Sequence, residues 1–184
     1  MQNTMSDIVQ AHDLSFQLYI SEEDIQRRVR EIGQALAAKF REDYPVFIGV
    51  LNGAFMFTAD LVRATNIQCE VAFTRLSSYQ GTSSTGHVNT LIGLDADLKG
   101  RHVIVVEDIV DTGGTLHQFK QTLSEKEPAS ITLVGFLMKP EVFKNRFKVD
   151  HVGYEIPNKF VIGYGLDYNG AGRQLSNIYQ LKED

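Results

Sequence analysis

The chain has 184 residues, of which 43% are hydrophobic and 22% are charged, and its formal net charge is −5. This size and composition are typical of a globular α/β protein, and we expect one domain over residues 1–184. The negative charge argues against nucleic acid or an anionic membrane as the main partner. Because the sequence has one cysteine, no basic-then-apolar leader and no apolar run near the ~20 residues of a membrane span, we expect a cytoplasmic protein.

The N-terminal part of the chain predicts an extended arm followed by a helix. Residues 1–20 show little pattern beyond two short apolar runs. From Ser21 to Phe40, apolar residues recur every three or four positions, which predicts an amphipathic helix. Ser21 and Asp24 are placed as in a capping box, so the helix should begin at this point.

The next segments alternate between strand and helix patterns, as expected for a parallel sheet. An apolar strand is predicted over residues 46–51, where Asn52-Gly53 breaks it, then a helix over about 54–64 and a strand over 69–76. The predicted helix should bury Phe55, Ala59 and Val62.

Residues 77–90, which begin Ser77-Ser78-Tyr79, are nearly all small and polar. The segment is too long for an ordinary connection and too localised for a linker. We interpret it as a flexible lid over a binding site.

The segment over residues 103–115 is the most informative part of the sequence. Four consecutive β-branched residues over 103–106 favour a strand buried on both faces, as in the middle of a parallel sheet. Polar and glycine residues follow where ligands bind to open α/β sheets. They are Glu107, Asp108, Asp111, Thr112, Gly113, Gly114 and Thr115.

The chemistry of this turn favours a phosphorylated sugar. Its glycines allow close approach of the backbone, and the free N–H groups at the start of the next helix suit a phosphate. The three carboxylates repel one another unless hydroxyls or a cation lie among them, and a sugar diol with Mg²⁺ supplies both. A helix cap, which is the alternative interpretation, needs only one acceptor.

The remaining chain predicts one more helix and several strands. Helical spacing continues to about residue 126, an apolar strand follows over 131–138, and Lys139-Pro140 stands at its end. Two short strands are predicted over 151–154 and 160–164.

These motifs resemble those of a known family. The pattern of an apolar strand, Glu-Asp, two apolar residues and Asp-Thr-Gly-x-Thr is similar to the phosphoribosyl-diphosphate (PRPP) motif of type I phosphoribosyltransferases. Further segments resemble the 6-oxopurine branch of that family, the hypoxanthine (hypoxanthine-guanine) phosphoribosyltransferases. They are Gly49 to Phe57, Ser77-Ser78-Tyr79, Lys139-Pro140, Val152 to Pro157 and Phe160 to Asn169.

The resemblance implies a fold, a reaction and a cofactor. The fold would be a mostly parallel twisted sheet flanked by helices, with a small hood and a flexible lid loop. The reaction would transfer the 5-phosphoribosyl group from PRPP to N9 of hypoxanthine, or guanine, and release pyrophosphate. Mg²⁺ would be the cofactor, and the protein would be a homo-oligomer, either a dimer or a tetramer.

The resemblance also implies a role for each matching residue. Asp111 would be the general base that takes a proton from the purine, at N7. PRPP would contact Glu107, Asp108 and the turn from Asp111 to Thr115, and its pyrophosphate would contact Leu51, Asn52, Gly53 and Arg173. The purine would contact Lys139, Phe160, Val161 and Asp167. The Mg²⁺ ligands would be Glu107, Asp108 and, at a second site, Asp167.

Two features of the sequence depart from the family pattern. Many members carry Lys in the position of Asn52, so here contact with pyrophosphate would come from the backbone. Gly170-Ala171-Gly172 precedes Arg173. Two other functions stay open, namely a PRPP-sensing regulator, which should have a basic nucleic-acid-binding face, and a phosphoribosyltransferase that prefers xanthine.

Overall fold

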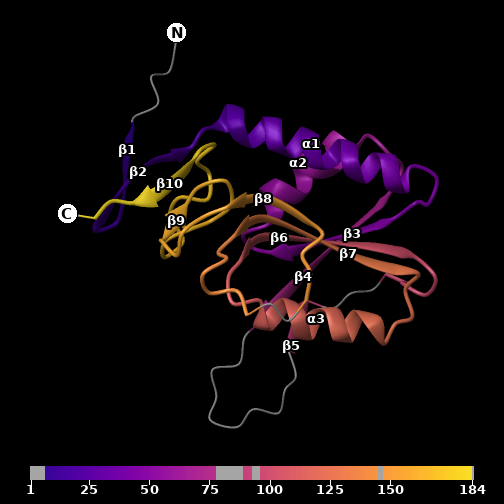
Figure 1. The fold of residues 1–184 in the computed structure, drawn as a ribbon. Helices are drawn as coiled ribbons and strands as arrows, with labels where there is room; N and C mark the ends of the chain where they lie inside the picture. The colour runs from indigo at the N-terminus through magenta and orange to yellow at the C-terminus, as the bar shows by residue number, and fades with distance from the viewer. Residues whose placement is uncertain (1–6, 78–88, 93–95, 145–146, 184) are drawn as a thin grey trace.

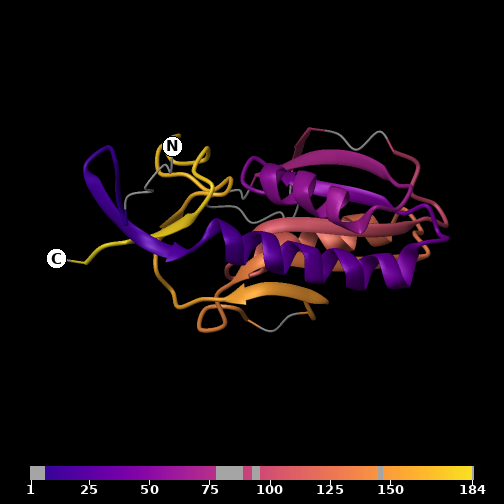
Figure 2. The ribbon, with the colours of Figure 1, turned by 90° about the horizontal axis from the view of Figure 1, so that it is seen from above.

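The computed structural model describes residues 7–77, 89–92, 96–144 and 147–183. In this part of the chain, a six-stranded sheet carries helices on both faces, and a four-stranded sheet lies beyond one end of it (Figures 1 and 2). None of the helices described is long and apolar enough to cross a membrane.

The large sheet has the order β5-β4-β3-β6-β7-β8. All neighbours are parallel except β5, which runs antiparallel to β4. The predicted central, mostly parallel sheet is therefore confirmed. Its strands are β3 (Val46–Leu51), β4 (Glu70–Ser77), β5 (Asn89–Ile92), β6 (His102–Val110), β7 (Ser130–Met138) and β8 (His151–Glu155).

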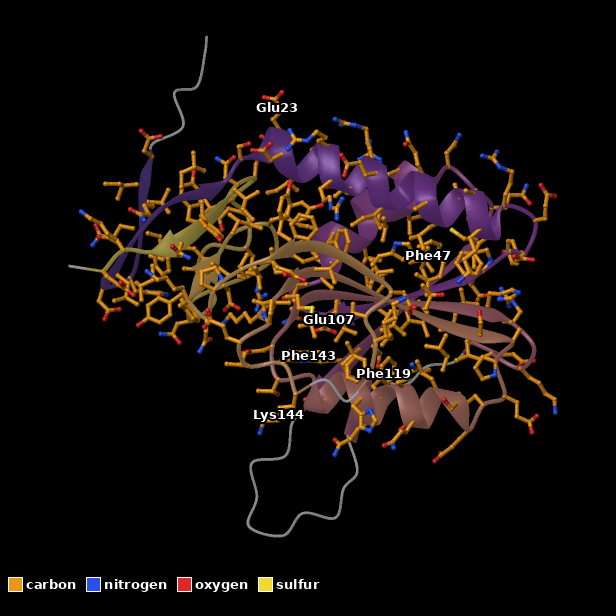
Figure 3. The ribbon with its side chains drawn as sticks, viewed as in Figure 1. Glu23, Phe47, Glu107, Phe119, Phe143 and Lys144 are labelled. Atoms are coloured by element: carbon orange, nitrogen blue, oxygen red, sulfur yellow. The ribbon has the colours of Figure 1, made fainter. Side chains whose placement is uncertain are left out.

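Alternate side chains of the buried strands form two cores. Helices α1 (Glu22–Phe40) and α2 (Phe55–Thr65) cover one face, where Phe47 is fully buried. Helix α3 (Gly114–Ser124) covers the other face with Phe119 (Figure 3). Because both faces are covered, the strands are continuous apolar runs, which is why they could be predicted.

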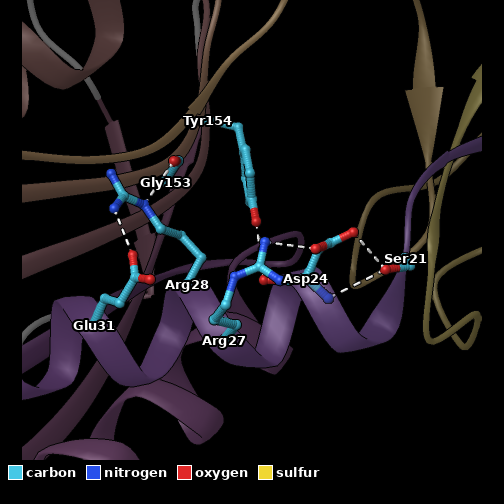
Figure 4. Close-up of polar contacts among 7 residues, drawn as sticks. All are labelled: Ser21, Asp24, Arg27, Arg28, Glu31, Gly153 and Tyr154. Carbon is cyan, nitrogen blue, oxygen red and sulfur yellow. Dashed lines mark hydrogen bonds and ion pairs between the residues drawn. The ribbon is translucent and has the colours of Figure 1, made fainter.

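Helix α1 begins at the predicted cap and is bound to the edge strand β8. The Ser21 hydroxyl accepts a hydrogen bond from the Asp24 backbone N–H at 3.2 Å. Arg28 donates to the carbonyls of Val152 and Gly153, and the Tyr154 hydroxyl donates to the Asp24 carbonyl at 2.9 Å (Figure 4). The two Arg28 bonds occupy carbonyl groups of an edge strand, where unpaired groups invite association with other chains.

The small sheet has the order β1-β2-β10-β9, and much of it was not predicted. The expected extended arm is an antiparallel hairpin of β1 (Ile8–Ala11) and β2 (Leu14–Ile20). Strand β10 (Ile178–Leu181) pairs with β2 and with β9 (Val161–Ile162), which is shorter than the strand predicted over 160–164. Strands of two to four residues carry too few alternations to be recognised.

Two further predictions were wrong in detail. Helix α2 buries Phe57, Thr58, Leu61 and Thr65 rather than the predicted face, and Phe55 is 38% exposed. Apolar residues occur on two faces of this helix, so their spacing alone did not identify which face is buried. Strand β6 continues through the acidic residues to Val110 because β7 keeps pairing with it to that point.

The central strands separate where the acidic residues begin. Pairing between β3 and β6 ends at Gly49 and Val106, whereas β3 stays paired with β4 to Leu51. The connection from β3 leads through α2 to β4, and the connection from β6 leads through α3 to β7. This point, where neighbouring strands connect in opposite directions, is where open α/β sheets form a ligand crevice.

Candidate active site

A pocket of about 240 Å³ opens at this crevice. Its floor is the turn between β6 and α3, in which Gly113 caps the helix with a φ of +75°. This left-handed conformation suits glycine and leaves the N–H groups of the first helical turn without acceptors inside the helix. The lining comprises Val50, Leu51, Leu76, Glu107, Ile109 to Gly114, Thr115 and Leu116.

Two neighbouring carboxyl groups, those of Glu107 and Asp108, are held at the mouth of the split between β3 and β6. Burial raises the pKa of Glu107 well above its ordinary value, and the nearby Asp108 raises it further. Burial also raises the pKa of Asp108, while the Ile109 backbone N–H, donating at 2.9 Å, and the more distant Arg173 oppose this rise. Such a pair favours a proton or a cation nearby.

Close backbone packing joins three segments beside these carboxyl groups. A Cβ atom on Gly53 would lie 1.5 Å from Asp108 Oδ2, and a Cβ atom on Gly165 would lie 2.0 Å from the Gly53 carbonyl oxygen. Position 165 therefore requires glycine, because its neighbour is backbone, whereas a side chain at position 53 would displace the Asp108 carboxylate. The Leu51–Asn52 peptide just before this contact is cis, and the Asn52 side chain is exposed.

One side of the site contains an ion pair between Lys139 and Asp111. Lys139 follows β7, is 9% exposed, and donates its backbone N–H to the Val110 carbonyl at 3.0 Å. Its Nζ atom lies 3.9 Å from Asp111 Oδ2. The sheet therefore brings together a buried ammonium and a half-exposed carboxylate that are 28 positions apart in the sequence.

A second ion pair, between Arg173 and Asp167, comes from the segment next to the small sheet. Arg173 Nη2 lies 2.7 Å from Asp167 Oδ1, and Nη1 donates to the Gly165 carbonyl at 2.6 Å. The other carboxylate oxygen of Asp167 accepts the Gly170 N–H at 2.6 Å. Both side chains are partly exposed, so a ligand could compete for them.

Phe160 and Val161 lie where the small sheet meets this segment. Val161 is buried in β9, whereas Phe160 is 42% exposed. The Phe160 ring meets Tyr168 edge to face, with centroids 5.9 Å apart, and packs at an angle against Phe16. One part of the aromatic ring is thus supported while another is left accessible to a planar ligand.

Most of the predicted lid lies outside the described residues, including Ser78 and Tyr79. Ser77 is the last residue of β4, and residues 89–90 belong to β5, which pairs with β4. Ser77 and residues 89–90 therefore lie in paired strands, and the lid over residues 77–90 stays a prediction.

Some residues that shape the crevice were missed. Val50, Leu76 and Leu116 line the pocket, but from the sequence they are ordinary apolar residues. Gly165 was recognised only as part of a longer motif, although the Gly163-Tyr164-Gly165 spacing is a signal for close backbone approach.

The fold and the crevice define a class: α/β proteins with a glycine-containing strand-to-helix turn, of the kind suited to anions, at the switch point of a parallel sheet. Comparison with known proteins narrows the class. Residues 21–169 match the phosphoribosyl transferase domain. The chain therefore belongs to the phosphoribosyl transferase family.

Individual relatives extend over nearly the whole chain. A hypoxanthine phosphoribosyltransferase of Haemophilus influenzae is 43% identical over 163 residues, which cover 86% of this chain and 91% of the relative. A hypoxanthine-guanine phosphoribosyltransferase of Bacillus subtilis is 40% identical, with 93% and 95% covered. The crystal structure of a hypoxanthine phosphoribosyltransferase from Staphylococcus aureus is similar with a TM-score of 0.86 and 35% identity, covering 90% of this chain and 91% of that chain.

Proposed function

We propose that the protein is a purine-salvage enzyme that transfers the 5-phosphoribosyl group of PRPP to N9 of hypoxanthine, and of guanine, and releases pyrophosphate. The observation that carries this proposal is the 3.9 Å separation of Lys139 Nζ and Asp111 Oδ2 beside the phosphate-binding turn. A 6-oxopurine carries O6 and N7 on one edge of its ring system. One donor and one acceptor at this spacing are complementary to that edge.

In this proposal Lys139 recognises the base and Asp111 moves a proton. The Lys139 ammonium is a donor only, so it pairs with the carbonyl O6 of hypoxanthine and opposes the amino group of adenine. Asp111 accepts the N7 proton as the bond to N9 forms, which is general base catalysis. Phe160 stacks on the base, and the backbone groups of Val161 and Asp167 accept hydrogen bonds at its other edge.

The remaining predicted residues bind PRPP. The backbone N–H groups and hydroxyls from Thr112 to Thr115 hold the 5′-phosphate. Glu107 and Asp108 bind the ribose hydroxyls. The backbone of Leu51-Asn52-Gly53 and the Arg173 guanidinium bind pyrophosphate, for which Arg173 exchanges its present pairing with Asp167.

The acidic residues fit Mg²⁺ bound jointly with the substrate. Oxygen donors suit this ion, and no group of three or more His, Cys, Asp or Glu side chains forms a metal cage among the described residues. Glu107 and Asp108 would hold the ion together with oxygens of PRPP, and Asp167 would hold a second one. Bound Mg²⁺ would neutralise charge on the leaving pyrophosphate.

A coupled spectrophotometric assay tests the function. The purified protein is given PRPP and Mg²⁺ with hypoxanthine, guanine, xanthine or adenine in turn. Hypoxanthine and guanine should be converted at substantial rates, and adenine should not. Conversion of adenine, or no reaction with either 6-oxopurine, would contradict the proposal.

We further propose that the protein is a homo-oligomer that associates through α2 and β4. Phe55, Val71 and Phe73 are each more than a third exposed, and Phe73 packs beside Gly49, which also faces Thr58 of α2. An exposed apolar surface of this kind is typical of an interface. Light scattering should show that Phe73→Lys lowers the molar mass, whereas the control Leu18→Lys, at a 37% exposed residue of the small sheet, should not.

A further inference from the structure

The chain that follows Lys139 folds back onto the glycine turn after β6. The Lys139 carbonyl accepts hydrogen bonds from the N–H groups of Val142 and Phe143, at 3.2 and 3.1 Å. These bonds form a tight turn between the lysine and the Phe143 ring. The position of one therefore depends on the position of the other.

The Phe143 ring packs directly on the backbone of Gly113. A Cβ atom on Gly113 would lie 2.6 Å from Phe143 Cε2 and 3.2 Å from Phe147 Cε1. Phe143 is only 8% exposed and belongs to the core beneath α3 that also contains Phe119 (Figure 3). The ring therefore packs against the turn and is not among the residues that line the pocket.

Further contacts hold the ring in place. Phe147 meets Phe143 edge to face, with centroids 5.3 Å apart, and stacks on His117 of α3 at 5.8 Å and 9°. The His117 backbone N–H donates to the Gly113 carbonyl at 2.9 Å. The aromatic residues after Lys139 thus contact both the beginning of the turn and the first turn of the helix.

We propose that Phe143 is a positioning residue that fixes the spacing between Lys139 and the phosphate-binding turn. The inference rests on the proposed function, in which Lys139 binds the base and the turn binds the 5′-phosphate. A nucleoside 5′-monophosphate must satisfy both groups at once, so it is sensitive to their spacing. A ligand that reaches only one of them is not.

The packing suggests how Phe143 would act. The backbone of Lys139 is held by β6 through Val110, whereas the Gly113 backbone has no side chain of its own to pack. With a smaller residue at position 143, the turn can shift relative to Lys139 while each keeps its own hydrogen-bonding groups. A misplacement of about 1 Å can cost roughly 10²-fold in the rate of a reaction that needs aligned groups, and a ligand held at both ends should lose affinity for the same reason.

The test compares one linked ligand with its two parts. Dissociation constants are measured for inosine 5′-monophosphate, for ribose 5-phosphate and for inosine. The proteins are the wild type, Phe143→Leu, Phe143→Ala and the matched control Phe119→Leu, which replaces another aromatic ring of the same core with a smaller side chain. Circular dichroism and thermal melting establish that each variant is folded, and Phe143→Leu alone suffices if the Ala variant is not.

Loss of the Phe143 ring should raise the dissociation constant of inosine 5′-monophosphate by about 10–100-fold. The dissociation constants of ribose 5-phosphate and of inosine should each rise by less than about 3-fold. Phe119→Leu should change all three by less than about 3-fold. Equal losses of affinity for the nucleotide and for ribose 5-phosphate would overturn the inference, since Phe143 would then only stabilise the turn. The same pattern of affinities in Phe119→Leu would overturn it too, since the effect would then belong to the whole core. A wild type that does not bind the nucleotide would instead refute the proposed function.

Discussion

The residues after β6 and β7 and the segment from Gly165 to Arg173 approach the same crevice, but different forces hold them. Asp111 and Lys139 extend from neighbouring strands whose pairing continues to Val110 and Met138. The Arg173 segment is held by local hydrogen bonds and by glycines that allow close backbone contact. The sheet therefore gives the side proposed to bind the base a fixed geometry, whereas the side proposed to bind pyrophosphate depends on individual turns.

This difference predicts that chemical changes on the sheet side reduce activity without unfolding the protein. The largest effect should come from Asp111→Asn, which removes the proposed base. Because the Asp111 side chain is 54% exposed, stability should hardly change, while kcat should fall by roughly 10²–10⁴-fold. Steady-state kinetics with thermal melting measures both, and near-normal turnover would reject the role.

Lys139→Ala should have the next largest effect. A charge-assisted hydrogen bond to O6 is worth about 1.5–3 kcal/mol, so kcat/KM for hypoxanthine should fall by about 10–150-fold. The KM for PRPP should change much less. Lys99→Ala, at a surface ion pair with Glu127, serves as the control and should change neither value. If Lys139→Ala weakens the use of PRPP as much as that of hypoxanthine, the lysine does not recognise the base.

On the other side of the crevice, a single methyl group should be enough to disturb the backbone packing. Gly165→Ala should lower the free energy of unfolding by about 1–3 kcal/mol more than Gly170→Ala does. Both glycines have positive φ angles, of 100° and 87°, but only at Gly165 would the Cβ atom meet the Gly53 carbonyl oxygen, while that of Gly170 meets no atom within 4 Å. Urea denaturation measures the free energy of unfolding of both variants. If both lose the same amount, the contact between Gly165 and Gly53 is unimportant for stability.

The smallest predicted effect concerns the partly buried Glu107. Because its pKa is raised in the folded protein, folding favours the protonated form, so this stabilising contribution is complete below the ordinary pKa of 4.5 and is lost as the pH rises through the folded value. Glu107→Gln should therefore raise the Tm of the ligand-free protein at pH 7 by at least about 2 °C, but not at pH 4. An equal change at both pH values would exclude the charge as the cause.

The same contrast explains how far the sequence could predict the molecule. The strands over 103–106 and 131–138 and the turn from Asp111 to Thr115 were predictable because burial on both faces requires apolar runs, and anion binding requires glycines at the strand end. The small sheet could not be predicted, because the pairing of Ile178–Leu181 with Leu14–Ile20 depends on contacts between segments that are far apart in the sequence. The contact of Gly165 with Gly53 leaves no periodic signal either.

The structure also explains which detail of the site the sequence could not supply. The motif at Glu107 and Asp108 indicated a carboxylate pair, but not that pairing of β3 with β6 stops at Val106 and leaves a crevice there. That separation depends on the different lengths over which three neighbouring strands pair. These lengths depend on how strands from distant parts of the chain pack together, so no single segment indicates them.

The central place of β10 in the small sheet has a consequence for synthesis on the ribosome. Strand β2 and the segment at Phe160 are joined through Ile178–Leu181, which is translated after every residue assigned to the crevice. A nascent chain that stops short of residue 178 should therefore form the large sheet before the small sheet can close. Limited proteolysis of stalled chains should find β3, β6 and β7 protected earlier than the hairpin at 8–20.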